Sequence, residues 1–133
     1  MKWLSVKRPL AISDIEQVER DLSIRFPSDY KKMIGAINGG ALKNAFVKVP
    51  DVGNVPYARN VSLSKDAPAS IYSLLPALNQ SKTTFLPFAG VGNGDYFCFD
   101  LRNDTVVFWM HETGNVFSVC DTFTQLLDRI ICQ

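Results

Sequence analysis

A run of short strands joined by tight turns occupies residues 84–119 and is the feature that most constrains how this chain folds. In its YFCFD stretch, Phe97 and Phe99 alternate with the other three side chains, so neighbouring side chains point to opposite faces of a sheet. Residues 106–110 form a nearly continuous apolar run, typical of a central strand covered on both faces. Segments rich in Gly, Asn and Asp, which favour chain reversals, separate the strands at residues 90–95, 102–105 and 113–115. We therefore predict three or four consecutive antiparallel strands.

Helical patterns flank this run and predict the layers that cover the sheet. Apolar residues recur every three or four positions in three segments, residues 12–23, 28–37 and 121–131. The last of these segments places Ile131 on its buried face. Residues 69–79 show the same pattern, and Pro76 limits them to a short or kinked helix.

The segment between the first helices and the strand run is less regular. Residues 41–49 fit a first strand. Residues 50–68 are interrupted by prolines and a glycine, and we interpret them as a loop that can hold a short strand at residues 55–57. This order predicts the α+β class, with a central, mainly antiparallel sheet flanked by N-terminal helices and a C-terminal helix.

Composition limits the class of protein. With 133 residues the chain can bury a full core, and we expect one domain over residues 1–133. The 14 basic and 13 acidic residues give a formal net charge of +1, which does not support a nucleic-acid binder. Three cysteines without CxxC spacing favour a reducing compartment, and no apolar run approaches the roughly 18 residues of a membrane span. We expect a cytoplasmic monomer or weak dimer that contacts neither nucleic acid nor membrane.

Motifs for catalysis or metal binding are weak. Residues 90–95 (GVGNGD) lack the GK[ST] ending of a phosphate loop, and a strand follows them, so a hairpin turn is favoured. His111 and Glu112 do not begin an HExxH motif, because residue 115 is Asn. One histidine cannot build a multi-histidine metal site. We therefore predict a chain that is not an enzyme and uses no cofactor and no metal.

Acidic residues gather around two of the turns. Asp95, Asp100 and Asp104 lie on either side of one strand, where capping of the turns is favoured over a calcium site. A hydrolase that uses Asp95, Asp100 or His111 is the alternative hypothesis, and it requires these side chains to converge in one pocket.

Two segments carry residues in a pattern shared with a known family. The first segment is residues 15–40, with Ile15, Glu19, Leu22, Pro27, Asp29, Tyr30, Asn38, Gly39 and Gly40. The second is residues 86–127, with Leu86, Pro87, Phe88, Gly94, Asp95, Tyr96, Asp100, Leu101, Val107, Trp109, His111, Glu112, Phe123 and Leu127. At these positions, and in this order, the chain resembles the SUKH superfamily, the Smi-one/Knr-four homology group. The chain departs from the pattern at Thr122, where the family has Ser, and residues 43–81 have no clear counterpart.

The resemblance implies an α+β, SUKH-like fold and a protein-binding role. Bacterial proteins of this kind are mostly immunity proteins, which bind and neutralise a cognate toxin domain, often a nuclease. Fungal relatives regulate cell-wall synthesis, so a regulatory scaffold for a non-toxin partner is the alternative. The net charge of +1 does not suit an inhibitor of a basic nuclease. Our candidate partner-binding residues are Asp95, Tyr96, Trp109, His111, Glu112, Asp51, Asn54, Tyr57 and Arg59.

Overall fold

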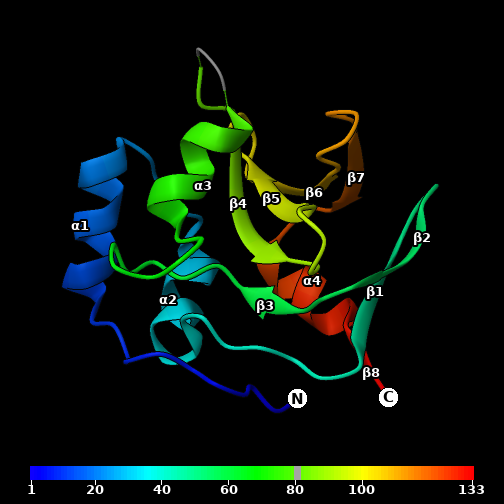
Figure 1. The fold of residues 1–133 in the computed structure, drawn as a ribbon, viewed down its shortest axis with the longest axis horizontal. Coiled ribbons are helices and arrows are strands. Elements are labelled where there is room, and N and C mark those ends of the chain that lie inside the picture. Colours follow the sequence, from blue (N-terminus) through cyan, green and yellow to red (C-terminus); the bar gives the residue numbers. More distant parts are fainter. Residues whose placement is uncertain (80–81) are drawn as a thin grey trace.

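A computed structural model describes residues 1–79 and 82–133 of the protein (Figure 1). In this part of the chain there are four helices, α1 (Ile12–Leu22), α2 (Ser28–Ile37), α3 (Ile71–Leu78) and α4 (Phe123–Arg129). The strands are β1 (Ala45–Val49), β2 (Gly53–Pro56), β3 (Arg59–Asn60), β4 (Phe85–Gly90), β5 (Tyr96–Asp100), β6 (Thr105–Trp109), β7 (Val116–Cys120) and β8 (Ile131–Cys132). The predicted α+β class is confirmed.

The larger sheet has five strands in the order β3-β4-β5-β6-β7, and every pairing is antiparallel. Its last four strands are the predicted run, joined by the predicted turns. Gly92 and Gly94 have φ values of 104° and 98°, which side chains rarely adopt, and this explains the glycines in the β4–β5 turn. A bulge between Pro87 and Ala89 shifts the register of β4 against β5.

A second, three-stranded sheet in the order β2-β1-β8 differs from the predicted single sheet. The segment predicted as a loop with a possible short strand at residues 55–57 contributes β2 at Gly53–Pro56, which pairs with β1 across a turn in which Asp51 has a φ of 67°. The predicted last helix ends at Arg129, because the following residues leave the helix and pair with Ala45 and Phe46. Ile131 is therefore 48% exposed, and its predicted burial is wrong.

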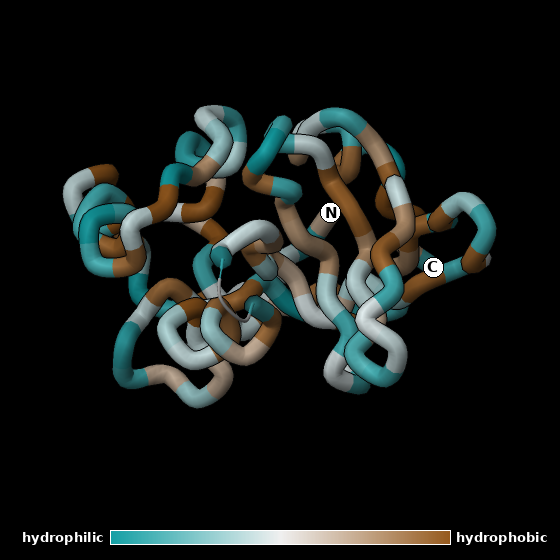
Figure 2. Tube along the Cα trace, turned by 90° about the horizontal axis from the view of Figure 1, so that it is seen from above, coloured by the Kyte–Doolittle hydropathy of each residue, from teal (hydrophilic) through white to brown (hydrophobic). Residues whose placement is uncertain are grey.

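The core lies between the inner face of the larger sheet and the helices. Phe88 and Phe99 stack with ring centroids 4.2 Å apart, and Tyr30 of α2 meets Phe99 and Phe123 edge-on at 5.3 and 5.1 Å. Burial raises the pKa of Tyr30 far above its usual range, so its hydroxyl stays neutral. Figure 2 shows hydrophobic stretches along the strands and hydrophilic turns at the periphery. Alternation along β5 thus creates the inner face, as predicted.

The first residues form an N-terminal strap (residues 3–10) that lies across α2. Leu4 exchanges two backbone hydrogen bonds with Ala41, and the Leu10 amide donates to Gly35. A Cβ at Gly35 would lie only 2.5 Å from the Leu10 carbonyl oxygen, so glycine permits this close approach. Both chain ends lie on the same side of the molecule (Figure 1). Within residues 1–79 and 82–133, no helix is long and apolar enough to cross a bilayer.

Candidate functional site: a groove beside β3

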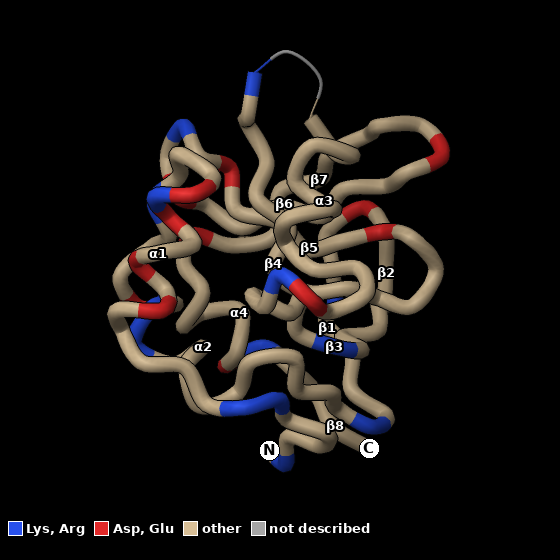
Figure 3. Tube along the Cα trace, turned by 60° about the vertical axis from the view of Figure 1, so that its left-hand side comes forward, with Lys and Arg blue, Asp and Glu red and all other residues tan. Residues whose placement is uncertain are grey.

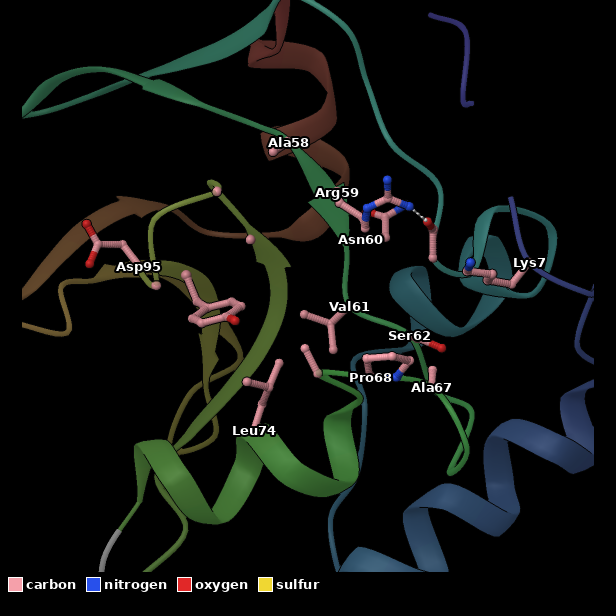
Figure 4. A pocket seen from close by; sticks show the side chains of 16 residues that line it. Lys7, Ala58, Arg59, Asn60, Val61, Ser62, Ala67, Pro68, Leu74 and Asp95 are labelled. Atoms are coloured by element: carbon pink, nitrogen blue, oxygen red, sulfur yellow. Dashed lines mark hydrogen bonds between the residues drawn. The ribbon is translucent and has the colours of Figure 1, made fainter. Parts of the chain in front are cut away.

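A groove of about 540 Å³ runs beside β3. It lies between β3, the segment that leads into α3, the first turns of α3 and the β4–β5 turn (Figure 4). We call it the β3 groove, and its main side chains are Lys7, Arg59, Asn60, Val61, Ser62, Pro68, Leu74, Asp95 and Tyr96. Three of the predicted partner-binding residues, Arg59, Asp95 and Tyr96, therefore line one cavity.

A buried hydrogen-bond chain fixes β3 beneath the groove. The Tyr57 hydroxyl donates to Asn60 Oδ1 at 2.5 Å, and Asn60 Nδ2 donates to the Ile37 carbonyl at 3.0 Å. Burial raises the pKa of Tyr57 well above its usual range, so this hydroxyl remains a donor. Tyr57 is 0% exposed, and it therefore supports the groove from below rather than offering a surface to a partner.

Two cations form one rim of the groove. Arg59 donates from Nη1 to the Gly39 carbonyl at 3.0 Å. The Lys7 amide donates to the Asn38 carbonyl at 2.8 Å, and the Lys7 side chain packs so closely on Gly39 that a Cβ there would lie 2.6 Å from Lys7 Cγ. In Figure 4 the side chains of Lys7 and Arg59 lie toward the same end of the groove, away from Asp95, and a dashed line marks the hydrogen bond of Arg59. The strap and β3 thus place two positive charges on the same rim of the groove.

An apolar wall continues from this rim. Val61 is buried, whereas Leu74 from α3 and Tyr96 from β5 are half-buried and line the cavity. Burial raises the pKa of Tyr96, so its hydroxyl is neutral near neutral pH. A wall of this kind next to cations can hold a ligand that has both apolar and anionic groups.

Asp95, in the β4–β5 turn, and His111, in the β6–β7 turn, connect these two turns at the far end of the groove. Asp95 Oδ1 accepts the His111 backbone amide at 2.9 Å and lies 2.5 Å from His111 Nδ1. The carboxylate so close to Nδ1 favours the tautomer with the proton on that nitrogen. Within the described residues, the His111 ring bonds to no hydroxyl or thiol, so the pair resembles a structural clamp more than a catalytic set.

The remaining predicted residues lie at two other places. Trp109 pairs with Tyr96 on the neighbouring strand and with Val116 on β7, which forms an aromatic and apolar row on the outer face of the sheet. Glu112 is exposed in the turn that follows β6. Asp51 and Asn54 are exposed on the β1–β2 hairpin and do not line the groove.

The hydrolase hypothesis required Asp95, Asp100 and His111 to converge. Asp95 and His111 meet, but Asp100 lies at the other end of β5, where Arg102 Nη2 donates to it at 2.7 Å. The Arg102 side chain lowers the pKa of Asp100 through this hydrogen bond. Asp100 thus caps its own turn, as predicted. The residues that the structure describes contain no group of three metal-ligating side chains.

Sequence reasoning missed several groove residues. Lys7 belongs to a short, mixed segment without periodicity, and Leu74 appears in the sequence only as an apolar helix position. Asn60 lies in the segment interpreted as a loop, and its role depends on Ile37, 23 residues away. Only the Asn-Gly-Gly sequence at residues 38–40 signalled an irregular backbone here.

A family model described as SMI1-KNR4 cell-wall, SUKH_6, matches residues 12–127. The chain belongs to this family. No curated protein and no solved structure matches it. Family membership confirms the resemblance derived from the sequence and supports a SMI1/KNR4-like protein-binding module, a kind of domain that is generally non-catalytic.

The matched span contains most of the β3 groove but not all of it. It includes β3, α3 and the β4–β5 turn, whereas Lys7 lies before its first residue. The strap therefore adds Lys7 to a groove whose other lining residues lie within the matched span.

Proposed function

We propose that this chain is a cytoplasmic immunity protein that binds a cognate toxin domain and neutralises it without catalysis. The observation that carries the proposal is the β3 groove, which combines exposed cations with an apolar wall on a domain of a protein-binding family. Binding surfaces of this kind pair apolar anchors with a polar rim.

The mechanism is occlusion by a stable interface. A specific interface of about 1,200–2,000 Å² in total is larger than the groove, so neighbouring surface must contribute. The outer-face row with Trp109 and Tyr96 adjoins the groove, and aromatic side chains often provide much of the binding free energy. The Asp95–His111 clamp holds both adjoining turns in place.

Co-expression with the product of a neighbouring toxin gene tests this proposal. We expect cells that produce the toxin to grow only when this chain is present, and the two purified proteins to elute as one complex in size-exclusion chromatography. A toxin that remains active and elutes separately would refute the immunity role.

A regulatory scaffold is the second candidate, and the family model's description as cell-wall favours it. In this role the same surface binds a regulatory protein instead of a toxin. Deletion of the gene distinguishes the two roles. An immunity protein is needed only when the toxin is present, whereas loss of a cell-wall regulator changes wall integrity in the absence of any toxin.

A further inference from the structure

The two cations of the β3 groove have no counter-ion from this chain among the described residues. The basic partners of the ion pairs among the described residues are Lys31, Lys65, Arg102 and His111. Neither Lys7 nor Arg59 takes part in an ion pair. Both are exposed at the rim. Like charges held close together repel each other, and a carboxylate placed between them would relieve this repulsion. It would also accept charge-assisted hydrogen bonds.

The acidic residue of the groove does not fill this role. Asp95 lies at the opposite end of the cavity from Lys7 (Figure 4). It is only 6% exposed, and its Oδ1 already accepts from His111. The cationic end of the groove therefore keeps its positive potential.

The distribution of charged residues over the molecule also favours an acidic partner. Figure 3 shows Lys and Arg concentrated toward the end of the molecule that carries both chain termini, where the strap lies, whereas most Asp and Glu lie elsewhere. Such a field attracts an acidic segment and repels a basic one.

We infer that the β3 groove is the docking site for an acidic and apolar peptide segment of the partner protein. A carboxylate lies between Lys7 and Arg59, and a neighbouring apolar side chain packs on Val61, Leu74 and Tyr96. This inference rests on the proposed function, because it specifies the partner chemistry of the same site. A net charge of +1 does not suit an inhibitor that must bind a basic surface. It does suit a chain that binds an acidic segment of its partner.

Fluorescence anisotropy with the full chain tests the inference without knowledge of the partner. The probe is a short fluorescein-labelled peptide of alternating leucine and glutamate. The comparison peptide has glutamine in place of each glutamate. We expect the glutamate peptide to bind about tenfold more tightly, because it alone forms the charge-assisted contacts. Equal binding of the two peptides, or binding of neither, would overturn the inference.

Charge-matched variants locate the binding site. Lys7→Gln and Arg59→Gln should each weaken the glutamate peptide about five- to tenfold. Lys43→Gln and Lys48→Gln remove the same charge at exposed positions outside the groove and should change binding less than about twofold. If all four variants weaken binding alike, the attraction is nonspecific and the docking site is wrong.

Arg59 also supports the backbone at Gly39, so a loss of binding in its variant needs an independent measurement. NMR titration of the unaltered chain provides it. We expect amide shifts at Gly39, Ser62 and Leu74 and none at Asn54 on the distant hairpin. Inorganic phosphate is the competing probe, and shifts caused by phosphate but not by the peptide would contradict a peptide site.

The outcomes separate the inference from the proposed function. If the toxin is neutralised equally well by the Lys7→Gln/Arg59→Gln double variant, the immunity role stands and the groove is not its docking site. If the peptide binds in the groove but no toxin is neutralised, the docking site stands and the immunity role fails.

Discussion

The two ends of the five-stranded sheet are held together in different ways. At the end that carries Asp100, the side-chain hydrogen bonds are local. Arg102 donates to Asp100, two residues away. Asn79 bonds to Leu75, Thr84 and Phe85, which all lie within six residues of Asn79 in the chain. We call this the local end.

At the opposite end, which borders the β3 groove, the bonds connect distant segments. Asp95 and His111 are 16 residues apart, Arg59 and Gly39 are 20 apart, and Asn60 and Ile37 are 23 apart. We call this the groove end. The local end uses its polar groups to close its own turns. The groove end instead keeps separate segments at fixed positions around an open cavity, and it leaves two cations available to a partner.

The largest expected difference between the ends concerns two asparagines. Asn60→Ala should lower the free energy of unfolding by about 3 kcal/mol, because the buried Tyr57 hydroxyl loses its acceptor and the Ile37 carbonyl loses one of its two donors, keeping only the Gly40 amide. Asn79→Ala should cost about 2 kcal/mol, because water can replace part of its bonds. Urea unfolding followed by tryptophan fluorescence measures both. A larger loss for Asn79→Ala would contradict the comparison.

The two aspartates should differ by less. Asp95→Ala should cost about 2 kcal/mol, because it releases two turns at once and leaves the His111 amide without its acceptor. Asp100→Ala should cost about 1 kcal/mol, because the Arg102 side chain is 67% exposed and can be solvated. The same unfolding experiment applies. Equal losses would mean that the long-range clamp adds nothing beyond a local turn.

Two glycines of the β4–β5 turn provide a finer test of the clamp. Gly92→Ala and Gly94→Ala should each cost about 1 kcal/mol through backbone strain, because both positions have positive φ. A Cβ at Gly94 would also lie 3.2 Å from His111 Nδ1, whereas nothing lies within 4 Å of one at Gly92. Thermal unfolding should therefore show a lower midpoint for Gly94→Ala. A midpoint for Gly94→Ala that is not lower than that for Gly92→Ala would show that the His111 ring moves away from the added Cβ without cost.

The smallest expected effect is a pH dependence at the local end. The Arg102 side chain lowers the pKa of Asp100 in the folded protein, so the ionised carboxylate contributes stability above its unfolded pKa of about 3.9. This contribution is lost as the pH falls through the folded pKa. The stability difference between the unaltered chain and Asp100→Asn should therefore be present at neutral pH and shrink in acid.

Local patterns predicted the local part of this fold. The strands β4 to β7 and their turns follow from alternation and turn residues, because each pairs with its neighbour in the chain. β3 and β8 are only two residues long and pair with distant segments, so no sequence period marks them. The groove residues also divide into those that were predicted from the sequence and those that depend on tertiary packing. Asp95, Tyr96 and Arg59 were predicted, whereas Lys7 and Leu74 reach the groove only through tertiary packing. A single domain over residues 1–133 stays a prediction.

The strap has a practical consequence for proteolysis. Trypsin cleaves after lysine and arginine except before proline, so the exposed Lys7 offers a cleavable bond to Arg8, whereas Pro9 protects the bond after Arg8. Cleavage after Lys7 would detach residues that are held by the Leu4–Ala41 bonds, by the bond from the Lys7 amide to the Asn38 carbonyl and by the contact of Trp3 with Tyr57, while the larger sheet would stay intact. A partner seated in the groove would shield this peptide bond, so the rate at which the strap is cut reports directly on occupancy.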